Sequence, residues 1–172
     1  HSTGLIVGSP AGGPEPKNVS IIGNLMAHNI ERNPLVSGGA VIVNNLVYNW
    51  QYKGIEVRGA MNAPVSSTQA SLVGNVFVRG KDSNNNPPIK LRNMKTNSQI
   101  YLSDNFAVDL SGSKQTAIVD NDVSSNIEVA SAPLWPSRLN AFSSGQVRAL
   151  VLADAGARPA DRDAVDARIV KS

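Results

Sequence analysis

The sequence predicts an all-β solenoid, in which each coil of short strands stacks on its neighbours. Five segments share one pattern, with apolar residues at alternate positions, then a small or polar residue, then an asparagine. The asparagines are Asn24, Asn45, Asn75, Asn105 and Asn121, and their spacings are 21, 30, 30 and 16 residues. A recurring unit with variable loops is typical of a solenoid. The apolar runs are short and rich in Val and Ile, which indicates strands rather than helices.

An asparagine at one fixed place in each coil has a physical use. Its amide carries both a donor and an acceptor, so stacked copies can hydrogen-bond along the solenoid axis. Asparagine also tolerates the left-handed backbone that tight turns often require. We therefore expect all five asparagines to form one ladder. The alternative is a set of ordinary hairpin turns that contain asparagine by chance.

Composition narrows the classes of function. The chain has 172 residues, of which 41% are hydrophobic, 5% aromatic and 17% charged. No apolar run approaches the ~20 residues of a membrane span, and the lack of cysteine excludes a disulfide framework and a thiolate metal site. The net charge is only +3, without the Lys/Arg run that marks nucleic-acid binding. We expect neither a membrane span nor a nucleic-acid partner.

Two regions are expected along the chain. Residues 1–130 read as the coils of a β-helix, interrupted by Gly-, Pro- and Asn-rich loops at residues 10–16, 62–68 and 82–88. Residues 131–172 read as a C-terminal tail with one or two short helices that packs on the coils.

The tail carries two helical patterns. Apolar residues follow a helical spacing between Ser144 and Ala155, and Gly156 is a plausible stop. Pro159 can occupy the first turn of a second helix that runs to about Val170.

Residues 1–9 resemble a strand in the middle of a coil. A terminal coil without a cap presents unpaired backbone and bare apolar side chains. We therefore expect an N-terminal segment of the same protein to stack on this coil. Residues 1–172 alone are expected to self-associate and to lack activity.

Three motifs make the prediction more specific. Asn24–Asn29 reads Asn-Leu-Met-Ala-His-Asn, residues 32–34 read Arg-Asn-Pro, and Asn44–Trp50 reads Asn-Asn-Leu-Val-Tyr-Asn-Trp. Together they resemble the core signature of the pectate lyase family, over about residues 1–60, and residues 155–166 resemble the tail of bacterial members. The resemblance implies a right-handed parallel β-helix. It also implies a secreted or periplasmic enzyme that cleaves a uronate-containing, pectin-like acidic polysaccharide by β-elimination.

The resemblance also implies roles for particular residues. It places the catalytic base at Arg32. An arginine side chain is almost wholly protonated near neutral pH, so such a site needs neighbouring cations and the reaction should favour alkaline pH. Family members use calcium, which neutralises the substrate carboxylate. Their acidic calcium ligands lie upstream of the matched region, so no metal ligand is assigned in this chain.

The chain departs from the family pattern at two places. The family often carries more arginines after the motif's proline, where this chain has Leu35, Val36 and Ser37, and a lysine where this chain has Thr3. We expect Lys53 and Arg58 to project into the same groove and to bind substrate. His28, at the end of an apolar strand, is expected to be a packed and hydrogen-bonded residue.

Two other functions stay open. One is a non-catalytic β-helix that binds glycans or serves as a structural module. The other is an esterase or polygalacturonase on the same fold, which would need paired aspartates in facing coils. The candidates for that pair are Asp104, Asp109, Asp120 and Asp122.

Overall fold

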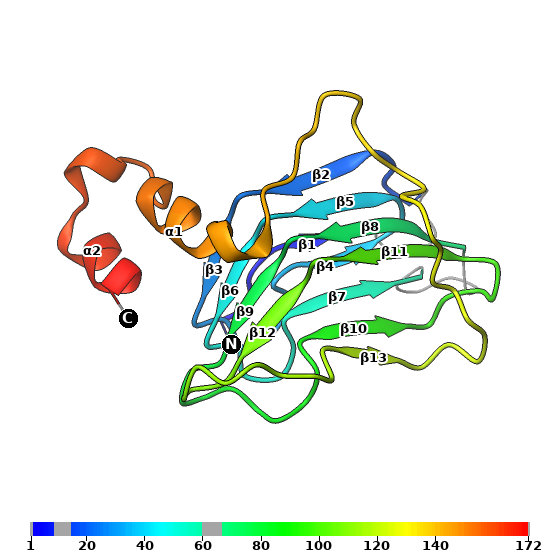
Figure 1. Ribbon diagram of the computed structural model, residues 1–172, viewed down its shortest axis with the longest axis horizontal. Helices are drawn as coiled ribbons and strands as arrows, with labels where there is room; N and C mark the ends of the chain where they lie inside the picture. Colours follow the sequence, from blue (N-terminus) through cyan, green and yellow to red (C-terminus); the bar gives the residue numbers. More distant parts are fainter. Residues whose placement is uncertain (1, 9–14, 60–66, 172) are drawn as a thin grey trace.

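The computed structural model describes residues 2–8, 15–59 and 67–171 (Figure 1). These residues form thirteen short strands, then two α-helices with a 3-10 turn between them. The strands are β1 (Ile6–Val7), β2 (Val19–Ile22), β3 (Leu25–Ala27), β4 (Leu35–Ser37), β5 (Ala40–Val43), β6 (Leu46–Tyr48), β7 (Ile55–Arg58), β8 (Gln69–Val73), β9 (Val76–Val78), β10 (Ile89–Arg92), β11 (Gln99–Ser103), β12 (Phe106–Val108) and β13 (Val119–Asn121).

Successive strands pass in turn to three parallel sheets. The five-stranded sheet has the order β1-β4-β7-β10-β13, and the two four-stranded sheets have the orders β11-β8-β5-β2 and β12-β9-β6-β3. Every strand pairs with its counterpart one coil away, as in the register Ile21–Ile42–Leu72. The predicted all-β solenoid is confirmed, and so is the tail with short helices.

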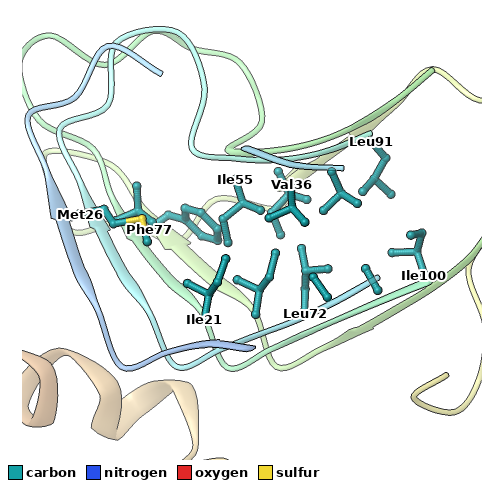
Figure 2. Packing of buried hydrophobic residues seen from close by; sticks show 14 of the residues in the cluster. Ile21, Met26, Val36, Ile55, Leu72, Phe77, Leu91 and Ile100 are labelled. Atoms are coloured by element: carbon teal, nitrogen blue, oxygen red, sulfur yellow. The ribbon is translucent and has the colours of Figure 1, made fainter. Parts of the chain in front are cut away.

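The core lies inside the coils, between the three sheets (Figure 2). In each strand the alternate residues point inward, and equivalent positions stack from coil to coil. Phe77 and Trp50 are fully buried and meet edge to face, with ring centroids 6.1 Å apart. Each large apolar side chain buried in this way contributes about 1.5–3 kcal/mol. Neighbouring coils therefore hold one another together.

The asparagine ladder is present, with four members. Asn45 donates from both its backbone N and its Nδ2 to Oδ1 of Asn75, at 3.1 and 3.0 Å. Asn24 makes the same pair of bonds to Asn45, and Asn75 makes it to Asn105. The Nδ2 groups of Asn45 and Asn75 also donate to strand carbonyls of the preceding coil. The ladder thus ties every coil from Asn24 to Asn105 to the next.

The prediction that Asn121 is a fifth member of the ladder is wrong. Asn121 ends β13, in the five-stranded sheet, where it pairs with Leu91. Its Oδ1 accepts a hydrogen bond from the backbone of Val123. The spacing of 16 residues after Asn105 is too short for the chain to return to the same turn, so the same tetrapeptide pattern occupies a different sheet.

Helix α1 (Ser144–Asp154) covers the outer face of the β12-β9-β6-β3 sheet, beside which it lies in Figure 1. Val147 and Val151 are buried against Leu46 and Val76. The carboxylate of Asp104, in the turn between β11 and β12, accepts hydrogen bonds from the backbone N and Oγ of Ser144. The first turn of α1 is therefore capped by the β-solenoid rather than by its own N-cap residue.

The second helix starts later than expected. Pro159 begins a 3-10 turn (Pro159–Asp161), and α2 spans Ala164–Lys171. Oδ1 of Asp163 accepts hydrogen bonds from the backbone N of Val165 and Asp166, as an N-cap side chain does. The capping aspartate, rather than the proline, sets the start of α2.

Within the described residues, no helix has the length and apolar character needed to cross a membrane. Most of the predicted loops at residues 10–16 and 62–68 lies outside the described residues. The Gly-Gly turn at residues 38–39 joins β4 to β5. Gly38 has a φ of +98°, and a Cβ there would lie 2.4 Å from the carbonyl oxygen of Pro16, so glycine is required.

Candidate functional site

Charged side chains gather on the outer face of the five-stranded sheet. Glu56 on β7 lies opposite Lys90 on β10, which lies opposite Asp120 on β13. Two residues further along the strands, Arg58 lies opposite Arg92. Because alternate residues of a strand share a face, these five side chains all lie on the side away from the apolar core.

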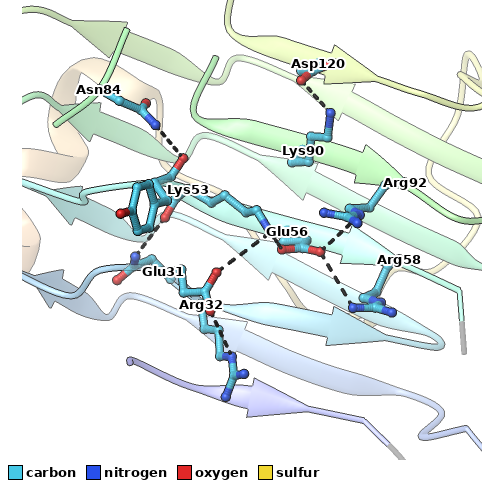
Figure 3. Close-up of polar contacts among 11 residues, drawn as sticks. Glu31, Arg32, Lys53, Glu56, Arg58, Asn84, Lys90, Arg92 and Asp120 are labelled. Carbon is cyan, nitrogen blue, oxygen red and sulfur yellow. Dashed lines mark hydrogen bonds and ion pairs between the residues drawn. The ribbon is translucent and has the colours of Figure 1, made fainter. Parts of the chain in front are cut away.

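Six of the charged residues around this face form one connected set of ion pairs, which we call the charged network (Figure 3). At its centre is Glu56, whose Oε2 lies 2.8 Å from Nζ of Lys53. The other carboxylate oxygen, Oε1, lies 3.6 Å from Nε of Arg92 and 4.0 Å from Nη1 of Arg58. The remaining members are Glu31 and Arg32.

Glu31 joins Arg32 to the rest of the charged network. One oxygen of its carboxylate lies 3.8 Å from Nε of Arg32, and the other lies 3.8 Å from Nζ of Lys53. Beside the network, Nζ of Lys90 pairs with Oδ2 of Asp120 at 2.5 Å. A continuous line of charges therefore crosses the outer face from the turn before β4 to β13.

The backbone of Arg32 is unusual. Its φ is +65°, in the left-handed region that disfavours most side chains. The other non-glycine residues with positive φ in the described parts of the chain are all asparagine, aspartate or histidine, which tolerate this region better. A strained residue that the surrounding structure holds in place is a common feature of functional sites.

Neighbouring coils hold this turn closely. The carbonyl of Arg32 accepts a hydrogen bond from the backbone N of Leu5 at 2.9 Å. At Gly4, a Cβ atom would lie 2.5 Å from that same carbonyl oxygen, so only glycine permits the approach.

Asn33 fixes the turn from within. Its side chain is fully buried, accepts a hydrogen bond from Nδ2 of Asn29 and donates one to the backbone carbonyl of Lys53. Its backbone N donates to the carbonyl of Gly54. The asparagine of the Arg-Asn-Pro motif thus links the backbone that carries Arg32 to the backbone that carries Lys53.

Several buried polar atoms of the charged network make no hydrogen bond. Among the described residues, these include Nε of Arg32, Oε1 of Glu56 and Nε of Arg92. Buried polar atoms of folded proteins are normally paired, and exceptions gathered in one place call for an explanation, such as a functional role. This face is therefore the best candidate for a ligand site.

The charge balance of the network favours an anion. Its four cations face two carboxylates, which leaves a net charge of +2. The side chains of the cations are 19–37% exposed, whereas that of Glu56 is 1% exposed. The positive groups therefore meet solvent, and the central negative group lies beneath them.

The structure brings the three predicted site residues, Arg32, Lys53 and Arg58, into this one network. Their roles stay predictions. The sequence analysis did not single out Glu56, Lys90 or Arg92. The period-2 pattern of β7 and β10 indicates that these residues share a face, but only the register between coils shows which of them meet.

The residues that replace the family's further arginines, Leu35, Val36 and Ser37, add no charge to this face. Leu35 and Val36 are buried. Oγ of Ser37 donates to Glu15 at 2.6 Å. His28 is exposed, and its Nδ1 lies 2.9 Å from Nδ2 of Asn49, while its ring meets Tyr48 edge to face. The expected hydrogen bond of His28 is present, but the side chain is less packed than expected.

Calcium does not fit the acidic groups of this face. Glu31 and Glu56 are both engaged with lysine and arginine side chains. Nowhere in residues 2–8, 15–59 or 67–171 do three or more His, Cys, Asp or Glu side chains gather as a metal site would require.

The four aspartates proposed for a hydrolase or esterase have other partners and do not form a pair. Asp104 caps helix α1, Asp120 pairs with Lys90, and Asp122 accepts from the backbone of Asn93. Asp109 lies in an exposed turn, where hydrogen bonds from the Ser111 side chain and the Ser113 backbone hold its pKa below the usual value. A carboxyl with a lowered pKa is a poor general acid.

A parallel β-solenoid is the architecture that the pectate lyase resemblance implies. The comparisons with known proteins agree with this resemblance. Over 83 residues, 48% of this chain, the sequence is 31% identical to a protein of Aspergillus flavus named probable pectate lyase C. Over 80 residues, it is 34% identical to proteins of the same name in Neosartorya fischeri and Aspergillus terreus.

The matched segments make up 17–18% of these relatives, so the chain spans less than a fifth of their length. No protein-family model matches the chain. With the solenoid fold, the relatives confirm the predicted resemblance to pectate lyases, a group of polysaccharide lyases.

Proposed function

We propose that this chain carries part of the active site of a polysaccharide lyase that cleaves a uronate-containing, pectin-like polysaccharide by β-elimination. The observation that supports it most is that Arg32, strained and tightly held, belongs to a network of cations on the face that favours an anion. Arg32 is the proposed base. Lys53 and Arg58 are the proposed carboxylate-binding residues.

The reaction needs two contributions from this face. The base takes the proton from the carbon next to the uronate carboxylate, the electron pair forms a carbon–carbon double bond, and the bond to the glycosidic oxygen breaks. The leaving oxygen then takes a proton from water. Cations around the uronate carboxylate stabilise the negative charge that develops there when the proton is removed. Arginine acts as a base only in its neutral form, so the proposed reaction favours alkaline pH.

Three further expectations remain part of the proposal. Calcium would be held by residues of an upstream segment, since the described acidic groups do not fit it. The same segment would stack on the first coil, where Leu5, Ile6 and Ile22 are each 42% exposed. A polysaccharide substrate also favours a secreted or periplasmic location.

The second candidate is a non-catalytic module that binds acidic glycans. The observation that favours it is that the family's further arginines are replaced by Leu35, Val36 and Ser37, which leaves fewer cations near Arg32. It uses the same anion-attracting face but makes no product.

One assay separates the candidates. The protein is purified together with the proposed upstream segment and incubated at alkaline pH, with and without calcium, with polygalacturonate, pectin or rhamnogalacturonan. Products are followed by the ultraviolet absorbance of unsaturated uronate. A lyase yields this absorbance together with new reducing ends. New reducing ends without the absorbance would indicate a hydrolase. Binding without either product would support the glycan-binding module and contradict the proposal.

A further inference from the structure

The buried carboxylate of Glu56 is unexpected on a face that attracts anions. Its side chain is 1% exposed, and cationic side chains of Lys53, Arg58 and Arg92 surround it. These three come from two coils, since Arg92 lies on β10 and Lys53 and Arg58 belong to the coil of β7. Without a negative charge among them, three like charges in this space would repel one another.

We propose that Glu56 is a positioning residue that holds Lys53, Arg58 and Arg92 as one carboxylate-binding array. Arg92, on the next coil, is the new member of this array. The proposal rests on the proposed function, because it assigns this array to the uronate groups of the acidic polysaccharide.

The contacts support a positioning role. Oε2 of Glu56 makes a 2.8 Å hydrogen bond with Nζ of Lys53, which fixes that ammonium group. Oε1 of Glu56 and Nε of Arg92 lie 3.6 Å apart, and neither makes a hydrogen bond to another described residue. The buried carboxylate thus draws both coils' cations toward one point, while their side chains stay 19–37% exposed to a ligand.

The contacts of β10, the strand that pairs with β7, support the assignment of Arg92 rather than Lys90 to the array. Lys90 lies directly opposite Glu56 in the sheet register, but its Nζ pairs with Asp120 on the far side. Lys90 is therefore neutralised by a partner of its own, and Arg92 shares Glu56 with the other two cations.

The direction in which Glu56→Gln changes the affinity for a polyanion distinguishes a positioning role from an effect of net charge alone. Glu56→Gln raises the net charge of the charged network from +2 to +3. A surface that binds a polyanion only through its summed charge would then bind more tightly. If Glu56 positions the array, the loss of its carboxylate releases the cations and binding weakens.

The test measures binding of a short oligogalacturonate by calorimetry to the protein purified with the proposed upstream segment. The carboxyl-reduced neutral oligosaccharide is the second ligand. Glu56→Gln and Arg92→Gln are each expected to raise the Kd for oligogalacturonate about tenfold, the range of a lost charge-assisted contact. Binding of the neutral ligand should stay unchanged. The double variant should bind little worse than either single variant, because both changes disrupt the same array.

Two variants provide controls. Asp161→Asn removes the carboxylate of an exposed ion pair with Arg158 and should leave the Kd unchanged. Glu56→Asp keeps the charge and should restore part of the affinity. Should Glu56→Gln fail to fold, Glu56→Asp carries the test. It keeps the net charge of the charged network but shortens the reach of the carboxylate, so positioning predicts a raised Kd and summed charge predicts an unchanged one.

The outcomes decide separately on this proposal and on the lyase. Unchanged or tighter binding by folded Glu56→Gln would overturn the positioning role. Unchanged binding by both Arg58→Gln and Arg92→Gln would overturn the array, and so would a wild type that does not bind oligogalacturonate. If the wild type binds, the variants weaken binding and no unsaturated product forms, the array is supported and the lyase activity is refuted. In an active enzyme, Glu56→Gln should lower kcat/KM at least about tenfold, because the array that it disrupts both binds the uronate carboxylate and stabilises the charge that develops in the transition state.

Discussion

The side-chain amide of Asn33 donates a hydrogen bond to the backbone carbonyl of Lys53 at 3.0 Å, and so joins the turn of the proposed base to the segment of a proposed substrate-binding residue. Asn33 itself is fully buried. The Arg-Asn-Pro motif therefore acts beyond Arg32 itself, by fixing one coil against the next.

Asn33→Ala should lower both stability and activity. It leaves the carbonyl of Lys53 and the amide of Asn29 without their partner, at a cost of about 1–3 kcal/mol in the free energy of unfolding. Denaturant unfolding and kcat/KM measure the two effects. Asn85→Ala, which removes one exposed hydrogen bond with Arg79, is the control and should change neither. Equal stability and equal kcat/KM of the two variants would contradict the role of Asn33 in fixing one coil against the next.

Arg32→Asn should separate stability from activity. Asparagine tolerates the φ of +65° better than arginine does, so the free energy of unfolding should stay unchanged or rise by up to about 1 kcal/mol, while product formation is lost. The reverse substitution, Asn18→Arg, at an exposed residue with a φ of 58°, should destabilise. A clear loss of stability in Arg32→Asn would show that the arginine supports the fold rather than a function.

Asn75→Ala tests the ladder at a fully buried member. Its Oδ1 accepts both bonds from Asn45, and its Nδ2 donates to Ile42 and Asn105, so the loss should destabilise by about 1–3 kcal/mol. Asn121→Ala, on an exposed residue outside the ladder, should stay within about 0.5 kcal/mol of the wild type. Similar thermal midpoints for the two variants would argue against the ladder as a source of stability.

Much of the fold could be predicted because it repeats. The ladder asparagines, the alternation of apolar residues and the helical spacing after Ser144 are local patterns, and each maps directly onto structure. Asn121 shows the limit of this approach. Its tetrapeptide matches the pattern, but the length of chain since Asn105 places it in another sheet.

The site could be predicted only in part. Arg32 was found through its motif, and Lys53 and Arg58 through their proximity to it in the sequence. Arg92 was not found because it lies 34 residues beyond Arg58, and only the stacking of β10 on β7 places the two side by side. Glu56 was not found because a single glutamate in a strand reads as a solvated residue, whereas the cations of two coils bury it.

The central claim, that Arg32 is the base of a β-elimination, is tested most directly by the rate of unsaturated uronate formation in the wild type and in Arg32→Lys. Lysine keeps the positive charge but not the geometry of the guanidine group, so the rate should fall by several orders of magnitude while circular dichroism and the thermal midpoint stay unchanged. Arg138→Lys, on an exposed residue of the tail, should keep the wild-type rate. A folded Arg32→Lys protein that keeps more than about a tenth of the wild-type rate would contradict the assignment.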